Sequence, residues 1–265
     1  MPTTPTTDVT LYQEVTGAGP VALLVAGTPG DCGPFADLAA ALSTSYTVVT
    51  YDRRGTSRSA RPDGWSTTSV AEQADDAAAV LAGLTSEPAL VLGTSNGAAV
   101  ALELALRHPA RASAVLVHEV PLLTVLEDPA PVGQMLGELI GSAMQAGGPP
   151  AALDAFLRFA YGDDAFDAID PLVRDRMLQN ADMVFEVELP AFQAYRPDEA
   201  ALSAVAVPVR VLVGEEQPVP FFAEAAEWLA RRVGTTVTAS PGAHAAHLTH
   251  PAQLAACVAA LDPAR

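Results

Sequence analysis

A serine flanked by glycines is the first feature of the chain that could do chemistry. Residues 93–97 read GTSNG, which matches the G-x-S-x-G pattern with Ser95 at its centre. An apolar run at residues 89–93 precedes the motif, and an alanine-rich helical pattern at residues 96–107 follows it. A strand, a sharp turn and a helix in this order would expose the Ser95 hydroxyl at a helix N-terminus, which favours developing negative charge. The alternative is a glycine-rich turn with Ser95 as a helix N-cap, but the flanking elements favour a nucleophile.

A serine hydroxyl is a weak nucleophile, so Ser95 would need a general base. The chain has five histidines. His108 ends a predicted helix, where it would interact with the last carbonyl groups. The remaining candidates follow predicted strands and are His118, His244, His247 and His250.

The base in turn needs a carboxylate that fixes its tautomer and stabilises the imidazolium. Two positions qualify because both follow predicted strands that should end near Ser95. Glu119 comes directly after the apolar run at residues 114–118, where an unpaired charge would be costly. Glu216 lies in a polar loop after residues 209–213, where it can be solvated. This local argument favours Glu119 and leaves Glu216 open as the alternative acid.

Apolar strand-like runs alternate with helical patterns along most of the chain, which predicts an α/β fold with a mostly parallel sheet. We expect strands at residues 9–15, 21–26, 46–51, 89–93, 114–118, 209–213 and 235–239. We expect helices at residues 34–42, 69–84, 96–107, 221–232 and 250–261. Residues 122–203 show only helical patterns, broken by glycine and proline. The sequence therefore predicts a core domain of residues 1–120 and 204–265, with a helical cap (lid) domain of residues 121–203 over the carboxyl edge of the sheet.

The Ser95 motif in this setting resembles the α/β-hydrolase fold family over nearly the whole chain. Residues 52–59 (DRRGTSRS) also look like the D-x-R-G-x-S-x-S loop of that family, whose role is mainly structural. The resemblance implies a mostly parallel central sheet flanked by helices, with the cap inserted after the sixth strand. It also implies that the base is His244, because PGAH at residues 241–244 and Pro251 match the spacing of the family.

The resemblance extends to the oxyanion hole, which needs two converging N–H donors. One would be the backbone N–H of Asn96, directly after the nucleophile. The other, by position in its loop, would be the N–H of Thr28. Many family members carry a histidine where this chain has Ala26, so what fixes that loop here is an open question.

One branch of the family, the zearalenone-type resorcylic lactone hydrolases, carries its acid as a glutamate in an H-E-x-P stretch. Residues 118–121 (HEVP) are similar to that stretch, and residues 30–32, 55–60 and 241–251 add to the similarity. The branch resemblance therefore implies Glu119 as the acid. Both tryptophans, Trp65 and Trp228, lie outside the expected cap, so no tryptophan wall over a resorcylic ring is evident.

The substrate pocket should be formed largely by apolar cap residues at helical spacing, with an adaptable surface. The predicted lining residues are Leu122, Leu123, Met135, Phe156, Phe185, Phe192 and Leu248.

Composition excludes several function classes. The 14 basic residues are all arginine, so chemistry that needs lysine is excluded. A net charge of −17 argues against a nucleic-acid partner and against an anionic membrane surface. Apolar runs are shorter than the ~18 residues needed to span a bilayer. Residues 1–8 are polar, and we expect them to be frayed. Two cysteines are too few for a disulfide framework. We expect a cytoplasmic monomer or homodimer without metal or cofactor.

These observations together predict a serine hydrolase that cleaves a carboxylic ester or lactone of a small, largely apolar substrate through an acyl-enzyme. The alternatives on the same fold are a thioesterase, a cofactor-free lyase or oxygenase, and a non-catalytic small-molecule receptor.

Overall fold

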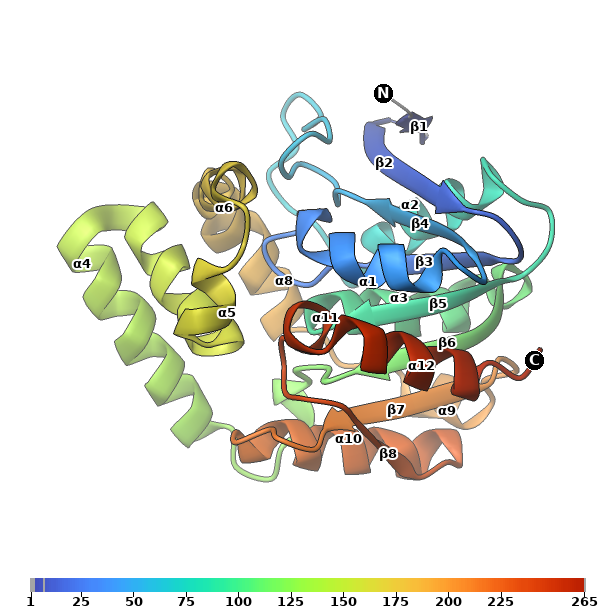
Figure 1. Cartoon of the computed structure of the whole chain (residues 1–265). Coiled ribbons are helices and arrows are strands. Elements are labelled where there is room, and N and C mark those ends of the chain that lie inside the picture. Colours follow the sequence, from blue (N-terminus) through green and yellow to red (C-terminus); the bar gives the residue numbers. More distant parts are fainter. Residues whose placement is uncertain (1–2, 7, 265) are drawn as a thin grey trace.

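The central feature of the computed structural model, which describes residues 3–6 and 8–264, is an eight-stranded sheet (Figure 1). The strand order is β1-β2-β4-β3-β5-β6-β7-β8, and every neighbouring pair from β4 to β8 is parallel. The bounds are β1 (Thr3–Pro5), β2 (Thr10–Gly17), β3 (Val21–Val25), β4 (Thr47–Tyr51), β5 (Ala89–Thr94), β6 (Ala112–His118), β7 (Val209–Gly214) and β8 (Val237–Ser240). The predicted α/β fold with a mostly parallel sheet is confirmed.

One strand was missed at the N-terminus. Thr3–Pro5 pairs antiparallel with β2 as β1, so the expectation that this part of the chain is frayed was wrong. The short polar run is ordered by main-chain hydrogen bonds to β2. A pattern of side chains does not predict such main-chain pairing. Residues 1, 2 and 7, to which the same expectation applied, lie outside the described residues.

Helices cover both faces of the sheet (Figure 1). Alternate strand side chains point to opposite faces, and two hydrophobic clusters result. Leu23 and Val25 pack with α2, α3 and α10, whereas Ala22 and Leu24 pack with α1 and α12. The bounds are η1 (Gly33–Phe35), α1 (Ala36–Leu42), α2 (Val70–Ala82), α3 (Asn96–Arg107), η2 (Pro109–Arg111), α10 (Pro220–Val233), α11 (Ala246–Thr249) and α12 (Pro251–Leu261). These elements agree with the predicted ones to within a few residues.

Between β6 and β7 the described chain contains helices and turns, and this part is called the helical segment below. Its elements are η3 (Leu123–Val125), α4 (Ala130–Tyr161), α5 (Asp163–Asp167), α6 (Pro171–Leu178), α7 (Ala181–Met183), the π-helical turn η4 (Val184–Glu188), α8 (Leu189–Gln193) and α9 (Glu199–Ser203). A separate hydrophobic cluster holds much of the segment together, with Leu153, Leu157, Phe166 and Met177 at its centre. Figure 1 shows α4 as a long arm beyond the sheet.

The sequence breaks in the helical segment have identifiable consequences. Gly147 and Gly148 have non-helical backbone angles, so α4 consists of two helical rods joined at a kink. Asp170 caps α6 by accepting hydrogen bonds from the N–H groups of Leu172 and Val173, as expected for an Asp-Pro helix start. Within the residues that the structure describes, no helix is long and apolar enough to cross a membrane.

Candidate active site

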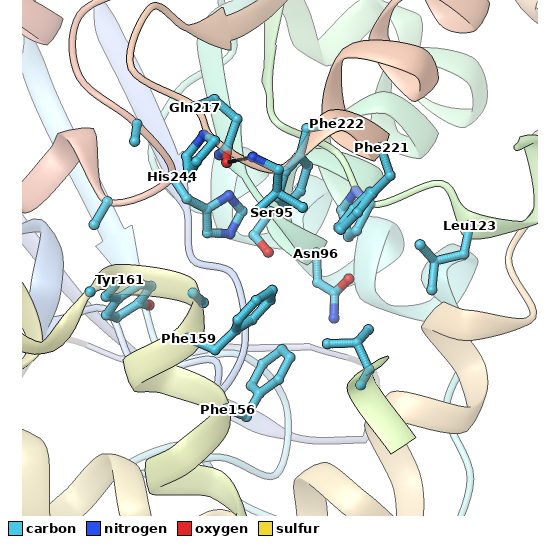
Figure 2. Close-up of a pocket in the computed structure, with 18 of the residues that line it drawn as sticks. Ser95, Asn96, Leu123, Phe156, Phe159, Tyr161, Gln217, Phe221, Phe222 and His244 are labelled. Carbon is cyan, nitrogen blue, oxygen red and sulfur yellow. Dashed lines mark hydrogen bonds between the residues drawn. The ribbon is translucent and has the colours of Figure 1, made fainter. Parts of the chain in front are cut away.

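Ser95 stands on a strained turn between β5 and α3. Its backbone has φ +54° and ψ −129°, and its N–H donates to the carbonyl oxygen of His118 at 2.9 Å. A Cβ atom at Gly93 would lie 2.2 Å from the carbonyl oxygen of Gly97, and one at Gly97 would lie 2.1 Å from that of Val25. Both glycines are therefore required for this turn, because backbone atoms occupy the space that a side chain would need. The result places Ser95 on the wall of a pocket (Figure 2).

His244 lies on the same pocket wall and is hydrogen-bonded to Glu119. The distance from its Nδ1 to Oε2 of Glu119 is 2.7 Å. The ring also stacks on Phe222, with 4.6 Å between the ring centroids. An ionised carboxylate only accepts hydrogen bonds, so Nδ1 carries the proton and Nε2 is left as the basic nitrogen.

Glu119 is fully buried, and its backbone has a positive φ of 50°. Besides His244, its carboxylate accepts hydrogen bonds from the N–H of Gly214 at 2.9 Å and from the side-chain amide of Gln217 at 2.5 Å. Burial alone would raise the pKa of Glu119, but the hydrogen bonds from His244 and Gly214 and the electrostatic interaction with the nearby imidazoles outweigh it and keep the pKa below its usual value. The carboxylate is thus held in its charged form.

Glu216, the alternative acid, lies at the pocket but takes a different place. Its side chain is exposed, and its backbone N–H donates to the carbonyl oxygen of Gly242. In the part of the chain that the structure describes, the carboxylate bonded to His244 is that of Glu119. Gln217, one residue further on, was not anticipated as a partner of that carboxylate.

The other histidines occupy different surroundings. His108 pairs with Asp75 away from the pocket. His118 and His247 are buried, and burial lowers the pKa of the former to about 4 and of the latter to about 3. His250 lines the pocket and is hydrogen-bonded to the hydroxyl of Thr249 at 2.9 Å.

Asn96 and Thr28, the predicted oxyanion-hole residues, are joined by a hydrogen bond. The side-chain amide of Asn96 donates to the Thr28 hydroxyl at 2.8 Å. Asn96 lines the pocket and is the first residue of α3, where the backbone N–H has no partner within the helix. Thr28 is buried behind the lining.

Arg53 holds the loop that carries Thr28. Its guanidinium, fully buried, donates to the carbonyl oxygens of Ala26 at 2.8 Å and Gly27 at 3.2 Å. The same guanidinium is ion-paired with Glu188 at 2.8 Å. This arrangement accounts for a loop that lacks a histidine at position 26. The sequence marked Arg53 only as part of a structural motif, and nothing in the sequence linked it to Glu188.

The pocket has a volume of about 390 Å³ and a mostly apolar wall. Of the predicted lining, Leu123, Phe156 and Phe192 are present. Phe159 and Tyr161 of α4, which helical spacing also made apolar candidates, line the pocket as well. Sequence reasoning left out Pro218, Val219, Phe221 and Phe222, which come from the loop before α10 and its first turn. Figure 2 shows these aromatic rings on opposite sides of Ser95.

The prediction was wrong for four lining residues. Leu122 is buried in the hydrophobic cluster that contains α2, α3 and α10. Met135 lies on the outer face of α4 and is 37% exposed. Phe185 and Leu248 pack against the separate cluster of the helical segment. Helical spacing identified apolar positions but not the direction in which each helix face points.

No arginine belongs to the pocket lining among residues 3–6 and 8–264, and the charged side chain there is Glu216. Across the same residues, no three His, Cys, Asp or Glu side chains form a group that could hold a metal ion. The arrangement can therefore supply a nucleophile, a base with a buried acid, and an apolar cavity.

Comparisons with known proteins give the following relationships. Residues 22–257 match the sequence profile of the alpha/beta hydrolase family. An uncharacterized hydrolase of Bacillus subtilis (strain 168) is 43% identical over 116 residues, which are 44% of this chain and 43% of that protein, so the match spans less than half of either. A zearalenone hydrolase of Bionectria ochroleuca is 25% identical over 253 residues, covering 92% of this chain and 90% of that one. The solved structure of the enol-lactonase from Burkholderia xenovorans LB400 matches with a TM-score of 0.79 at 19% identity, covering 98% and 99% of the two chains.

Proposed function

Because the chain belongs to the alpha/beta hydrolase family, we propose that it is a serine hydrolase that cleaves a carboxylic ester or lactone. The observation that carries the proposal is a strained Ser95 on the same pocket wall as His244, whose other ring nitrogen is bonded to the buried Glu119. A nucleophile, a base and a group that orients the base are the parts that acyl transfer requires.

Acylation begins when Nε2 of His244 takes the proton of the Ser95 hydroxyl and Oγ forms a bond to the carbonyl carbon. The carbonyl π electrons move to oxygen, and the backbone N–H groups of Asn96 and Thr28 stabilise the resulting oxyanion. The intermediate collapses, the bond to the leaving oxygen breaks, and the imidazolium of His244 protonates that oxygen. In a lactone the leaving hydroxyl stays attached to the acyl group.

Deacylation repeats these steps with water as the nucleophile. His244 takes a proton from the water, hydroxide adds to the acyl carbon, and Ser95 leaves with the proton that His244 returns. Glu119 remains ionised throughout and stabilises the imidazolium, consistent with its lowered pKa.

The lining indicates the kind of substrate. Aromatic and aliphatic side chains dominate, and the described lining offers no arginine to a substrate carboxylate. An uncharged, apolar ester or lactone fits such a wall, because an anion would lose its hydration without gaining a partner. A zearalenone hydrolase and an enol-lactonase are among the proteins that this chain is similar to. On this proposal residues 121–203 act as a cap that covers the pocket.

The test is intact-protein mass spectrometry after treatment with a fluorophosphonate. We expect one adduct on the wild type and none on Ser95→Ala. Ser57→Ala is the matched control, because Ser57 also has a positive φ (52°) but does not line the pocket, and it should label like the wild type. A folded wild type without an adduct would contradict the serine mechanism and favour a small-molecule receptor.

A further inference from the structure

Glu188 is a fully buried acid that does not line the pocket. It ends the π-helical turn η4 and therefore belongs to the helical segment. Its Oε1 atom accepts hydrogen bonds from Nη2 of Arg53 at 2.8 Å and from the Thr28 hydroxyl at 2.5 Å. Oε2 is buried and has no hydrogen-bond partner among the described residues. The hydrogen bonds of this carboxylate therefore connect the helical segment to two loops, the one after β3 and the one after β4.

The Thr28 hydroxyl connects Glu188 to Asn96 through two hydrogen bonds. A hydroxyl has a single proton to donate, and here it goes to the carboxylate. The hydroxyl oxygen is then left to accept, and it does so from the side-chain amide of Asn96 at 2.8 Å. Glu188 thus fixes the direction of one hydrogen-bonded chain through the two residues whose backbone N–H groups form the proposed oxyanion hole.

Arg53 supplies a second connection to the same loop. It donates to the carbonyl oxygens of Ala26 and Gly27 while it pairs with Glu188. Removal of the carboxylate charge would leave a buried guanidinium without its counter-ion, and the guanidinium would then be expected to shift its contacts. The two accepting carbonyls belong to the two peptide groups before Thr28, and the second of these peptide groups carries the Thr28 N–H.

We infer that Glu188 is a positioning residue, which aligns the oxyanion donors Thr28 and Asn96 from the helical segment. The inference rests on the proposed function, because it needs an oxyanion to stabilise. π-Helical turns inside α-helical regions frequently occur at functional sites, and here the turn ends at the residue that makes the contact. Glu188 acts through Thr28 and Asn96 rather than on substrate.

The test compares Glu188→Gln with wild type on p-nitrophenyl butyrate. We expect kcat to fall by about 10- to 100-fold with KM within about twofold, since a misplaced oxyanion donor affects the transition state selectively. Affinity for an alkyl trifluoromethyl ketone, which forms a tetrahedral adduct on serine, should fall in parallel with kcat. Affinity for the matching methyl carbinol, which forms no adduct, should stay unchanged.

A double-mutant cycle of Glu188→Gln and Thr28→Val tests the hydrogen-bonded chain from Glu188 through Thr28 to Asn96. The Thr28→Val variant keeps the backbone N–H but lacks the hydroxyl, so it breaks the chain at its middle. If Glu188 acts through Thr28, the double variant should lose little more kcat than the stronger single variant. The Thr28→Val variant also gives an answer if Glu188→Gln does not fold, because it alone should then lower kcat and ketone affinity together.

Arg176→Gln is the matched control. Arg176 of α6 pairs with Asp31 at 2.5 Å and so also connects the helical segment to the loop after β3, and its hydrogen bonds go to Asp31 rather than to Thr28 or Asn96. The Arg176→Gln variant should have a lower free energy of unfolding than the wild type, and its kcat should stay within about twofold of the wild-type value. Equal kcat losses in Arg176→Gln and Glu188→Gln would reduce Glu188 to a structural role. A wild-type kcat in Glu188→Gln would overturn the inference and leave the proposed function standing, whereas a wild type without fluorophosphonate labelling would remove both.

Discussion

The two sides of the pocket are built differently. On the sheet side, Ser95 and Glu119 follow the ends of β5 and β6 with positive φ angles, and the carboxylate accepts three hydrogen bonds. On the side of the helical segment, Phe156 and Phe159 extend from the second rod of a kinked helix that rests on its own small hydrophobic cluster. Polar groups with reactive roles need such tightly fixed positions, whereas an apolar wall only needs shape. We therefore expect sheet-side changes to affect kcat and changes in the helical segment to affect KM.

The largest effect should come from the acid. Glu119→Gln keeps the shape of the side chain but removes the charge that stabilises the imidazolium, so kcat should fall by about 10²- to 10⁴-fold. Glu216→Gln should stay within about threefold, because Glu216 is exposed and solvated. Steady-state kinetics on p-nitrophenyl butyrate check both. A larger loss in Glu216→Gln than in Glu119→Gln would transfer the role of the acid to the loop after β7.

The wall itself should reject anions. Phenyl hemisuccinate and phenyl pentanoate have acyl chains of similar length, but the former carries a carboxylate. We expect kcat/KM for the hemisuccinate to be lower by about 10²-fold, because its carboxylate would lose hydration in a mostly apolar lining without an arginine. Equal values for the two esters would show that the charged end stays in solvent and that the pocket does not select by charge.

A pair of aromatic substitutions separates the two sides directly. Phe222 stacks on His244, so Phe222→Ala should free the imidazole and lower kcat by about tenfold. Phe159 lines the opposite side, and Phe159→Ala should raise KM by about three- to tenfold with little change in kcat. Similar kinetic changes in the two variants would contradict the division between chemistry and shape.

Low pH should lower the free energy of unfolding through a histidine at the contact between the two sides. His247 packs between Phe35 of η1 and Tyr161 of α4, and burial lowers its pKa to about 3 from 6.5. Between these pH values the unfolded chain binds the extra proton, so the free energy of unfolding falls as pH falls below about 6.5. His118, with a pKa of about 4, acts in the same direction.

The Tm of the wild type should therefore fall between pH 7 and pH 5, and the Tm of His247→Leu should fall by at least about 3 °C less over the same range. Differential scanning calorimetry across this range measures the effect. His108→Gln, on the surface beside Asp75, should keep the wild-type slope. A variant at position 247 with an unchanged slope would mean that this histidine accepts its proton in the folded state.

The sheet side was also the more predictable side. Local patterns favoured Ser95 and Glu119, and the resemblance to the family assigned Asn96 and His244. The structure brings all four together because each follows a strand or opens a helix at one edge of the sheet. Gln217 was missed because its contact with Glu119 depends on how two loops meet.

On the side of the helical segment, sequence patterns were a weaker guide. Met135 and Phe156 are both apolar and both on α4, yet one faces outward and the other lines the pocket. The kink at Gly147 and Gly148 changes the direction of the helix between them, so no single helical period relates their faces. The pair of Arg53 and Glu188 is 135 residues apart in sequence, and only the packed fold brings it together.

That pair has a consequence for building chimeras. A loop after β3 that is fixed by a histidine of its own could accept any helical segment of suitable shape. Here that loop depends on Arg53, whose counter-ion Glu188 lies in the helical segment. Replacement of residues 121–203 by a segment without a glutamate at the position of Glu188 would leave Arg53 buried without its partner. In such a chimera Arg53 and Glu188 have to be transferred together, although they lie in two separate parts of the sequence.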